Sequence, residues 1–163
     1  MRTQTKDLFD TTDTFILTFG LSEVWYDAET QNAFWRTVPK QYYDPSRHLF
    51  RVSTVKENSD NIDAIYKLIC KHRPDAKIIV TLFPIPLIAT FRDESCIMAN
   101  SVSKSVLRVA IDEVLQARKD EGFLFYLPSY EIVMDVFQAP FKQDRRHLEA
   151  PILDFIMIQF ERV

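Results

Sequence analysis

Three short apolar runs constrain what this chain can fold into more than any other feature. They cover residues 14–19, 77–82 and 123–126, and each is rich in β-branched or aromatic residues. Runs of this length and composition indicate strands that are buried on both faces, as in parallel sheets. Segments with helical spacing separate the runs. The alternation predicts one α/β domain over residues 1–163, with a parallel sheet and right-handed crossovers.

Short polar residues suggest where the helices begin. Asn58 or Ser59 is placed to cap the first long helix and Asn100 or Ser101 the second, because such side chains accept hydrogen bonds from the first free N–H groups. A final helix is predicted over residues 150–161. We expect it to bury Ile152, Phe155, Ile156 and Phe160.

Residues 27–53 form a long segment with little periodicity. We expect a loop with a hairpin that packs over the functional site, in which His48 is structural. Aromatic residues alternate with arginines there, as they do in RNA-binding surfaces. The net charge of −3 nevertheless argues against nucleic acid and against an anionic membrane as partners.

Polar and aromatic residues directly follow the first predicted strand. Gly20, Ser22, Glu23 and Trp25 come after its last residue, and parallel α/β folds place active sites at the carboxyl ends of their strands. We take these four residues and Asn100 as candidates for substrate or oxyanion contacts. The structural alternatives are a surface carboxylate for Glu23 and simple packing for Trp25.

Asp144 precedes His147 by three residues near the end of the sequence. In serine esterases such a histidine removes the proton from a serine hydroxyl, and the aspartate holds the imidazole in the productive tautomer. This Asp-x-x-His pattern closes the sequences of the SGNH hydrolases, although it is also common by chance. The structural alternative is a surface loop in which Arg145 and Arg146 form salt bridges.

Other kinds of site find little support in the sequence. The histidines form no His-x-x-x-His pattern and the cysteines no Cys-x-x-Cys pair, so no metal is expected. With two glycines the chain builds no phosphate-cradling loop, and no cofactor is expected. Ser101 and Lys104 match the Ser-x-x-Lys pattern of β-lactamases, but the partner motifs Ser-Asp-Asn and Lys-Thr-Gly are absent.

The sequence also carries expectations about location. It opens on polar residues, without the pattern of a signal peptide, and holds no apolar run long enough to span a membrane. Cys70 and Cys96 are the two cysteines, and we expect both to be reduced thiols. These features predict a cytoplasmic protein.

Five ordered segments resemble a known family. They are residues 17–25, 81–92, 99–108, 126–132 and 144–147. Over nearly its whole length the chain resembles the GSCFA family of bacterial proteins, which is similar to the SGNH hydrolases. The resemblance implies an SGNH-like or flavodoxin-like three-layer fold, and chemistry on small-molecule or glycan esters, polysaccharide among them. By motif position it implies His147 as the base and Asp144 as the group that orients it.

The sequence departs from this family's pattern in places that matter. Ser22 and Glu23 stand where SGNH enzymes carry an oxyanion-hole Asn, and Phe83 stands where a small Ser is expected. No Gly-Ser pair occurs, so the Gly-Ser-Cys-Phe-Ala motif that carries the family's expected nucleophile is absent. We therefore expect a domain that is incomplete at its N-terminus, with an unpaired strand edge at residues 14–19 and the missing segment as a partner.

The sequence leaves three functional hypotheses open. The first is a serine esterase or acyltransferase to which this chain contributes the base but not the nucleophile. The second is a non-catalytic glycan-binding or complex-forming protein, whose aromatic side chains stack on sugars. Its candidate residues are Trp25, Trp35, Tyr42 and Tyr43, for which core packing is the alternative. The third is that another serine replaces the nucleophile; the candidates are Ser22, Ser101 and Ser129.

Overall fold

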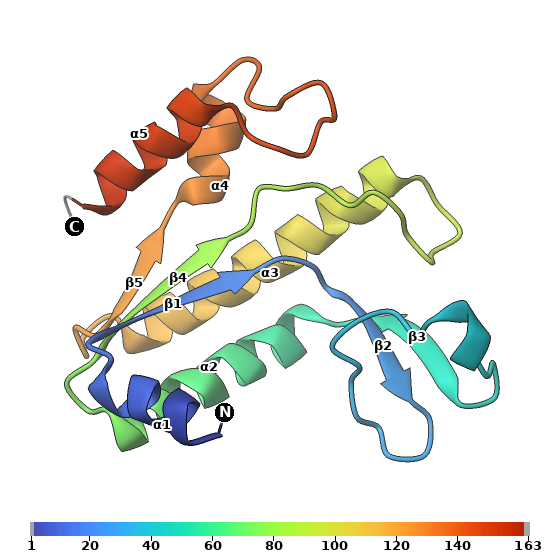
Figure 1. Cartoon of the computed structure of the whole chain (residues 1–163), viewed down its shortest axis with the longest axis horizontal. Helices are drawn as coiled ribbons and strands as arrows, with labels where there is room; N and C mark the ends of the chain where they lie inside the picture. Colours follow the sequence, from blue (N-terminus) through green and yellow to red (C-terminus); the bar gives the residue numbers. More distant parts are fainter. Residues whose placement is uncertain (1, 162–163) are drawn as a thin grey trace.

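A parallel three-stranded sheet carries the helices, and an antiparallel hairpin projects beside it (Figure 1). The computed structural model describes residues 2–161. The sheet strands are β1 (Thr14–Phe19), β4 (Lys77–Leu82) and β5 (Leu124–Leu127), and the hairpin strands are β2 (Glu23–Asp27) and β3 (His48–Val52). The long helices are α1 (Arg2–Thr11), α2 (Val55–His72), α3 (Cys96–Arg118) and α5 (Ala150–Phe160). Short helical turns are η1 (Lys40–Tyr42), α4 (Ser129–Glu131) and the π-helical η2 (Ile132–Val136).

The strand order in the sheet is β1-β4-β5, and both pairings are parallel. The register of β1 against β4 runs from Thr14 opposite Lys77 to Phe19 opposite Leu82. The predicted α/β architecture with a parallel sheet is therefore confirmed. All three strands end at the same edge of the sheet, so the loops that leave them gather on one side of the molecule.

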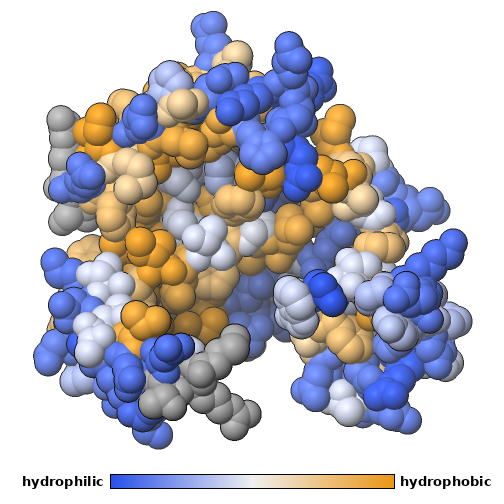
Figure 2. Space-filling view, in the orientation of Figure 1, coloured by the Kyte–Doolittle hydropathy of each residue, from blue (hydrophilic) through white to orange (hydrophobic). Residues whose placement is uncertain are grey.

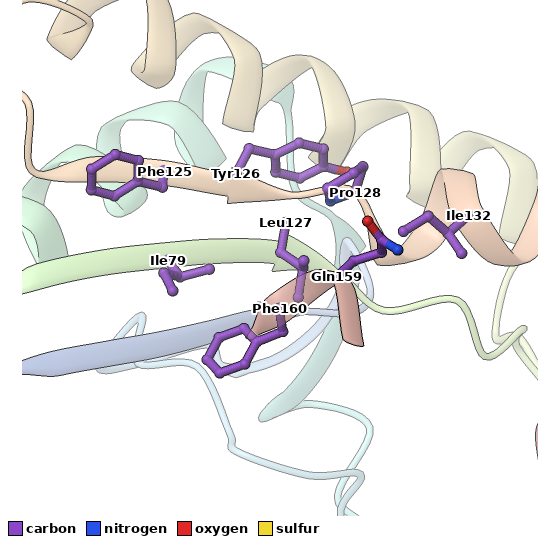
Figure 3. Close-up of a pocket in the computed structure, with 8 residues that line it drawn as sticks. All are labelled: Ile79, Phe125, Tyr126, Leu127, Pro128, Ile132, Gln159 and Phe160. Atoms are coloured by element: carbon purple, nitrogen blue, oxygen red, sulfur yellow. The ribbon is translucent and has the colours of Figure 1, made fainter. Parts of the chain in front are cut away.

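The main core lies between the sheet and helices α2 and α3. On β4 the alternate residues Ile78, Val80 and Leu82 are buried against these helices, because successive side chains of a strand point to opposite faces. The helices contribute the remaining fully buried members, which are Ile62, Tyr66, Ile69, Leu107, Ala110, Ile111 and Val114. Helix α5 lies on the opposite face of the sheet, where Ile79 and Phe125 share a cavity of about 210 Å³ with its Phe160 (Figure 3).

Both predicted helix starts are wrong by about one turn. Helix α2 begins at Val55, where Thr54 and Glu57 form a reciprocal capping box. Helix α3 begins at Cys96, after the cap Ser95. Asn100 and its neighbour Ser101 therefore lie inside α3, and Asn58 and Ser59 lie inside α2. In each case an equally good capping residue stands earlier in the chain, and propensity alone did not separate the two positions.

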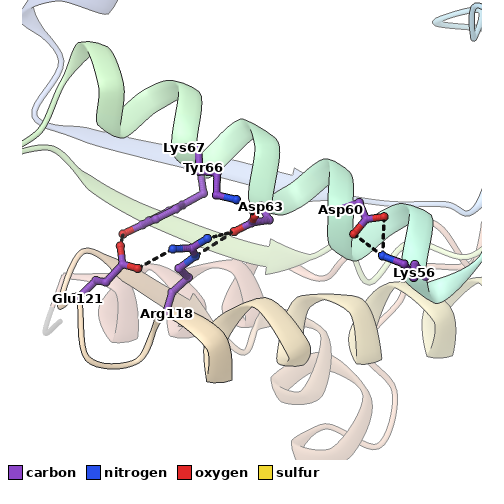
Figure 4. A network of polar contacts seen from close by, with 7 residues as sticks. All are labelled: Lys56, Asp60, Asp63, Tyr66, Lys67, Arg118 and Glu121. Carbon is purple, nitrogen blue, oxygen red and sulfur yellow. Dashed lines mark hydrogen bonds and ion pairs between the residues drawn. The ribbon is translucent and has the colours of Figure 1, made fainter.

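A polar network fastens the solvent side of α2 to the end of α3 (Figure 4). The guanidinium of Arg118 donates to Asp63 at 2.6 Å and to Glu121 at 2.7 Å, and the hydroxyl of Tyr66 donates to Glu121 at 2.7 Å. These contacts hold the pKa of Asp63 and of Glu121 below their usual range, chiefly through the hydrogen bonds from Lys67 and Arg118 respectively. The network fixes the two helices against each other at the end remote from the candidate site.

Strand β1 is not buried on both faces, which corrects the prediction for residues 14–19. Phe15, Leu17 and Phe19 pack against the core, whereas Ile16 on the other face is 53% exposed. Figure 2 shows apolar surface gathered over this part of the sheet. Among the described residues β1 pairs only with β4, so the expected unpaired strand edge is present. Phe155 of α5, predicted to be buried, is also exposed, and its ring packs edge-to-face on that of Phe137.

We expect Ile16→Lys to reduce self-association of the chain. A free edge beside an exposed apolar side chain favours strand pairing between molecules, and lysine on such an edge opposes it. The substitution is expected to change the free energy of unfolding by less than about 1 kcal/mol, because the side chain is exposed. Light scattering against protein concentration measures the effect. Leu8→Lys, at an exposed position of α1, is the matched control, and an equal effect of both variants would contradict the role of the edge.

The hairpin begins earlier than the sequence predicted. Strand β2 starts at Glu23, which pairs with Val52, and ends at Asp27, which pairs with His48. Glu23 and Trp25 therefore lie on a strand instead of a loop. The buried Asp27 accepts the backbone N–H of Thr30 at 3.0 Å and the guanidinium of Arg47 at 2.6 Å, and these hydrogen bonds, the backbone one foremost, lower its pKa. The ion pair between Asp27 and Arg47 joins the two ends of the long connection between β2 and β3.

Candidate functional site

Asp144 and His147 lie on a small closed loop between η2 and α5. Phe141 and Leu148 form an antiparallel bridge at its base, and the N–H of Lys142 donates to the carbonyl of His147 at 2.8 Å. Arg145 adopts a left-handed conformation with φ of 55°, which turns the chain sharply between the two residues. The loop therefore holds the aspartate and the histidine on the same side of a tight turn.

The carboxylate of Asp144 organises this loop. Its Oδ1 accepts the backbone N–H groups of Arg146 at 2.9 Å and of His147 at 3.0 Å, and its Oδ2 hydrogen-bonds with Nδ1 of the His147 ring. The hydrogen bond to the His147 ring, followed by those from the backbone, holds the pKa of Asp144 well below its usual range. The aspartate is thus an anion at neutral pH and fixes the orientation of the imidazole.

The other ring nitrogen of His147 is free to act on a ligand. The side chain is 73% exposed, and within residues 2–161 no hydrogen bond engages its Nε2. Its ring hydrogen-bonds to neither a serine nor a cysteine among these residues. The geometry is that of an oriented base whose substrate-side atom is accessible.

A cavity of about 370 Å³ lies beside this loop. Arg146, the neighbour of His147, lines it together with Glu23 and Trp25 of β2. The Oε1 atom of Glu23 accepts a hydrogen bond from the hydroxyl of Thr90 at 2.6 Å. The remaining wall is mostly apolar, and its residues come from the strand-exit loops and β3: Leu21, Thr37, Phe50, Pro86, Leu87, Ile88, Ala89 and Phe91.

Trp25 forms the centre of an aromatic cluster at this cavity. Its ring meets those of Phe91 at 4.7 Å, Phe50 at 5.5 Å and Tyr43 at 5.7 Å between centroids, and the contacts to Phe91 and Tyr43 are edge-to-face. Its indole Nε1 is buried and has no hydrogen-bond partner among the described residues. The cluster joins the hairpin to the loop after β4, so the wall of the cavity is built from segments far apart in the sequence.

Gly20 and Ser22 lie beneath the cavity in a buried polar cluster. The ammonium of Lys104 donates to the carbonyl of Gly20 at 2.9 Å and to that of Phe83 at 2.6 Å, which ties together the loops that leave β1 and β4. Burial lowers the pKa of Lys104 to about 8. The backbone N–H of Ser22 donates to Oγ of Ser103 at 2.6 Å, and Ser22 is 0% exposed.

Asn100 holds one of the loops that line the cavity. From within α3, its Oδ1 accepts the backbone N–H of Leu87 at 3.1 Å, and Leu87 lines the cavity. Ser129 is buried at the end of β5, where its hydroxyl contacts that of Thr81 at 2.6 Å and donates to the carbonyl of Leu82 at 3.2 Å. Asn100 therefore positions a loop, and Ser129 fastens β5 to β4.

The protein-family comparison identifies the chain. The model of the GSCFA family matches residues 1–160. This chain belongs to the GSCFA family. The resemblance inferred from the five sequence segments is thereby confirmed, while the comparison with curated proteins finds no match.

The structure brings together part of the set that the sequence proposed for this GSCFA chain. Glu23 and Trp25 share the cavity with Arg146, and so reach the neighbourhood of His147. Gly20 and Ser22 form a layer below it, and their roles toward an oxyanion stay predictions. To donate its backbone N–H to an oxyanion, Ser22 would have to release its hydrogen bond to Ser103.

Sequence reasoning missed several residues of this site. Thr90 and Phe91 lie in a segment that supported the family resemblance, but neither was proposed as a site residue. Lys104 was considered only within a Ser-x-x-Lys pattern, and its serine neighbours Ser103 and Ser105 gave no sign in the sequence that its side chain is buried. A loop held by salt bridges of Arg145 and Arg146 was the structural alternative for this segment, and among residues 2–161 neither arginine forms one.

Two classes of feature are absent from the described part of this GSCFA chain. Residues 2–161 hold no group of three or more His, Cys, Asp or Glu side chains arranged to bind a metal ion. None of the helices within these residues has both the length and the apolar character that a membrane crossing requires.

Proposed function

We propose that this GSCFA chain provides the base half of a serine esterase or acyltransferase site. His147 is the general base and Asp144 is the residue that orients it. The single observation that supports this proposal is the contact between Asp144 and Nδ1 of His147 on a closed loop that borders a substrate-sized cavity. The substrate is an ester of a small molecule or of a glycan.

The proposed reaction assigns each proton. Nε2 of His147 takes the hydroxyl proton as a serine oxygen attacks the ester carbonyl carbon, and the imidazolium that forms is stabilised by the Asp144 carboxylate. When the tetrahedral intermediate collapses, the same proton passes to the departing alcohol oxygen and leaves an acyl-serine. Water or a second alcohol then attacks the acyl-serine, with His147 again as the base.

The nucleophile in this proposal comes from a Gly-Ser-Cys-Phe-Ala segment outside residues 1–163. Ser22 and Ser129 are poor substitutes because both are buried and already hydrogen-bonded within the fold. Ser101 is exposed on α3, and no contact joins it to the His147 ring. The open edge of β1 is the place where such a segment would add a strand, which would extend the sheet toward the SGNH-like or flavodoxin-like three-layer fold that we propose.

Complementation tests this function. The chain alone is expected to hydrolyse p-nitrophenyl acetate no faster than free imidazole does at the same concentration. Co-expression with a Gly-Ser-Cys-Phe-Ala-containing segment from another GSCFA protein is expected to raise the rate by at least about 10³-fold, because triad members act as a unit. The added segment with its serine changed to alanine is the control. Robust turnover by the chain alone, abolished in His147→Ala, would contradict the assignment of the nucleophile.

A further inference from the structure

The cavity beside His147 is the end of a longer groove. It shares Trp25, Thr37 and Phe91 with a second cavity of about 480 Å³. Arg146 lines the first cavity only, so the groove starts at the catalytic loop and runs onto the hairpin. The shared wall residues place the two cavities next to each other.

A third cavity adjoins the second. It has a volume of about 230 Å³ and shares Thr37 and Val38 with the second cavity. Trp35 and Tyr42 are among the residues that line it. These three cavities together form the hairpin groove.

Aromatic side chains line every part of the hairpin groove. Trp25 and Phe91 wall the first and second cavities, Tyr43 lines the second, and Trp35 and Tyr42 line the third. Trp35 is 87% exposed and Tyr42 is 69% exposed. Neither ring is needed for the core, and two large exposed aromatics on one surface mark a binding site better than a packing site.

Each cavity also carries one cationic side chain. Arg146 lines the first, Lys40 the second and Arg36 the third. Within residues 2–161 none of the three forms an ion pair, whereas most other arginines of the chain do. The guanidinium of Arg36 lies over one face of the Trp35 ring, 4.7 Å from its centroid, so the other face of this ring is the one that a sugar would stack on. The single carboxylate in the groove is Glu23. A chain with a net charge of −3 thus places three cations that have no carboxylate partner among residues 2–161 along one aromatic groove.

We propose that the hairpin groove binds a linear acidic glycan, with successive sugar rings in the three cavities. A ring with an apolar face and polar edges fits a wall that offers an aromatic face and one cation per cavity. A fatty acyl chain would require an enclosed apolar channel, and this groove is open and charged. Glu23 accepts from sugar hydroxyls at the end nearest His147.

Glycan binding in this groove deepens the proposed function, and it rests on that function only for the position of the ester. If the esterase assignment holds, the glycan carries its ester at the Arg146 end, beside Nε2 of His147. Binding itself needs no nucleophile. A binding measurement on the chain alone therefore succeeds or fails independently of the hydrolysis experiment.

Intrinsic fluorescence is a direct test, because the only two tryptophans of the chain, Trp25 and Trp35, both line the groove. Tetragalacturonate is expected to change the emission saturably, with an affinity that falls as salt screens the charges. Cellotetraose, which is neutral, is expected to bind at least about fivefold more weakly, as the loss of one charged hydrogen bond implies. Tetraglutamate tests an acidic peptide in place of a glycan.

Two variants locate the binding. Trp35→Ala is expected to weaken tetragalacturonate binding about tenfold, and Arg146→Ala about fivefold, when measured by calorimetry. Arg145→Asn removes the neighbouring charge outside the groove, suits the left-handed backbone there and should leave the affinity unchanged. The proposal is overturned if tetragalacturonate does not bind, if cellotetraose or tetraglutamate binds as tightly, or if Arg145→Asn weakens binding as much as Arg146→Ala.

Discussion

Asp144→Asn is expected to lower ester turnover of the complemented protein about 10⁴-fold, the loss that follows when a serine enzyme's histidine is held in the wrong tautomer. The Oδ1 atom of asparagine still accepts the N–H groups of Arg146 and His147, so the loop keeps its shape. The amide nitrogen, however, would face Nδ1 of His147 and donate to it. The ring proton then moves to Nε2, and the atom that must accept the serine proton is blocked.

The tautomer change is measurable on the chain alone. The ¹⁵N chemical shifts of the His147 ring at a pH where the ring is neutral are expected to show the proton on Nδ1 in the unaltered chain and on Nε2 in Asp144→Asn. Asp44→Asn is the matched control, since Asp44 also holds an exposed turn through its Oδ1. A turnover loss below about tenfold, with unchanged histidine shifts, would remove Asp144 from the mechanism.

Lys104→Met is expected to lower the free energy of unfolding by about 2–4 kcal/mol, which is the largest stability effect we anticipate near the site. Methionine fills a similar volume but leaves the carbonyls of Gly20 and Phe83 without their charged donor, and each such hydrogen bond contributes about 1.5–3 kcal/mol. Denaturant unfolding monitored by circular dichroism measures the change. Lys119→Met, at an exposed position just after α3, should change the stability by less than about 0.5 kcal/mol.

The pH dependence of this effect has a defined sign. Burial lowers the pKa of Lys104 to about 8 in the folded chain, while the unfolded chain titrates near the ordinary value of about 10.4. Between these values the unfolded state binds more protons, so this lysine adds stability as the pH rises through the window. The stability difference between the unaltered chain and Lys104→Met should therefore be larger at pH 9.5 than at pH 7.5. A stability difference that stays constant or shrinks between these pH values would contradict the burial of the Lys104 ammonium.

Much of the secondary structure follows from local sequence. The three strand segments and the apolar stripe of α3 were predicted, because burial against a core imposes periods that are visible in the residues themselves. Helix starts were less accurate, as Thr54 and Ser95 show, since several residues near each boundary are able to cap. The hairpin strand that holds Glu23 and Trp25 was missed, because its pairing with residues 48–52 is set by contacts distant in sequence.

The candidate site likewise combines contacts that local sequence predicts with contacts that only the tertiary structure sets. The sequence by itself predicted the pair of Asp144 and His147, because a separation of three residues allows one loop to hold both side chains, and the structure adds the turn at Arg145 that brings them into contact. The sequence also determined the family. Only the tertiary structure decided that Glu23, Trp25 and Arg146 share one cavity, that Ser22 is buried against Ser103, and that Lys104 joins the exits of β1 and β4. These contacts depend on the strand order, which brings the carboxyl ends of β1 and β4 side by side, and local patterns do not encode which strands become neighbours.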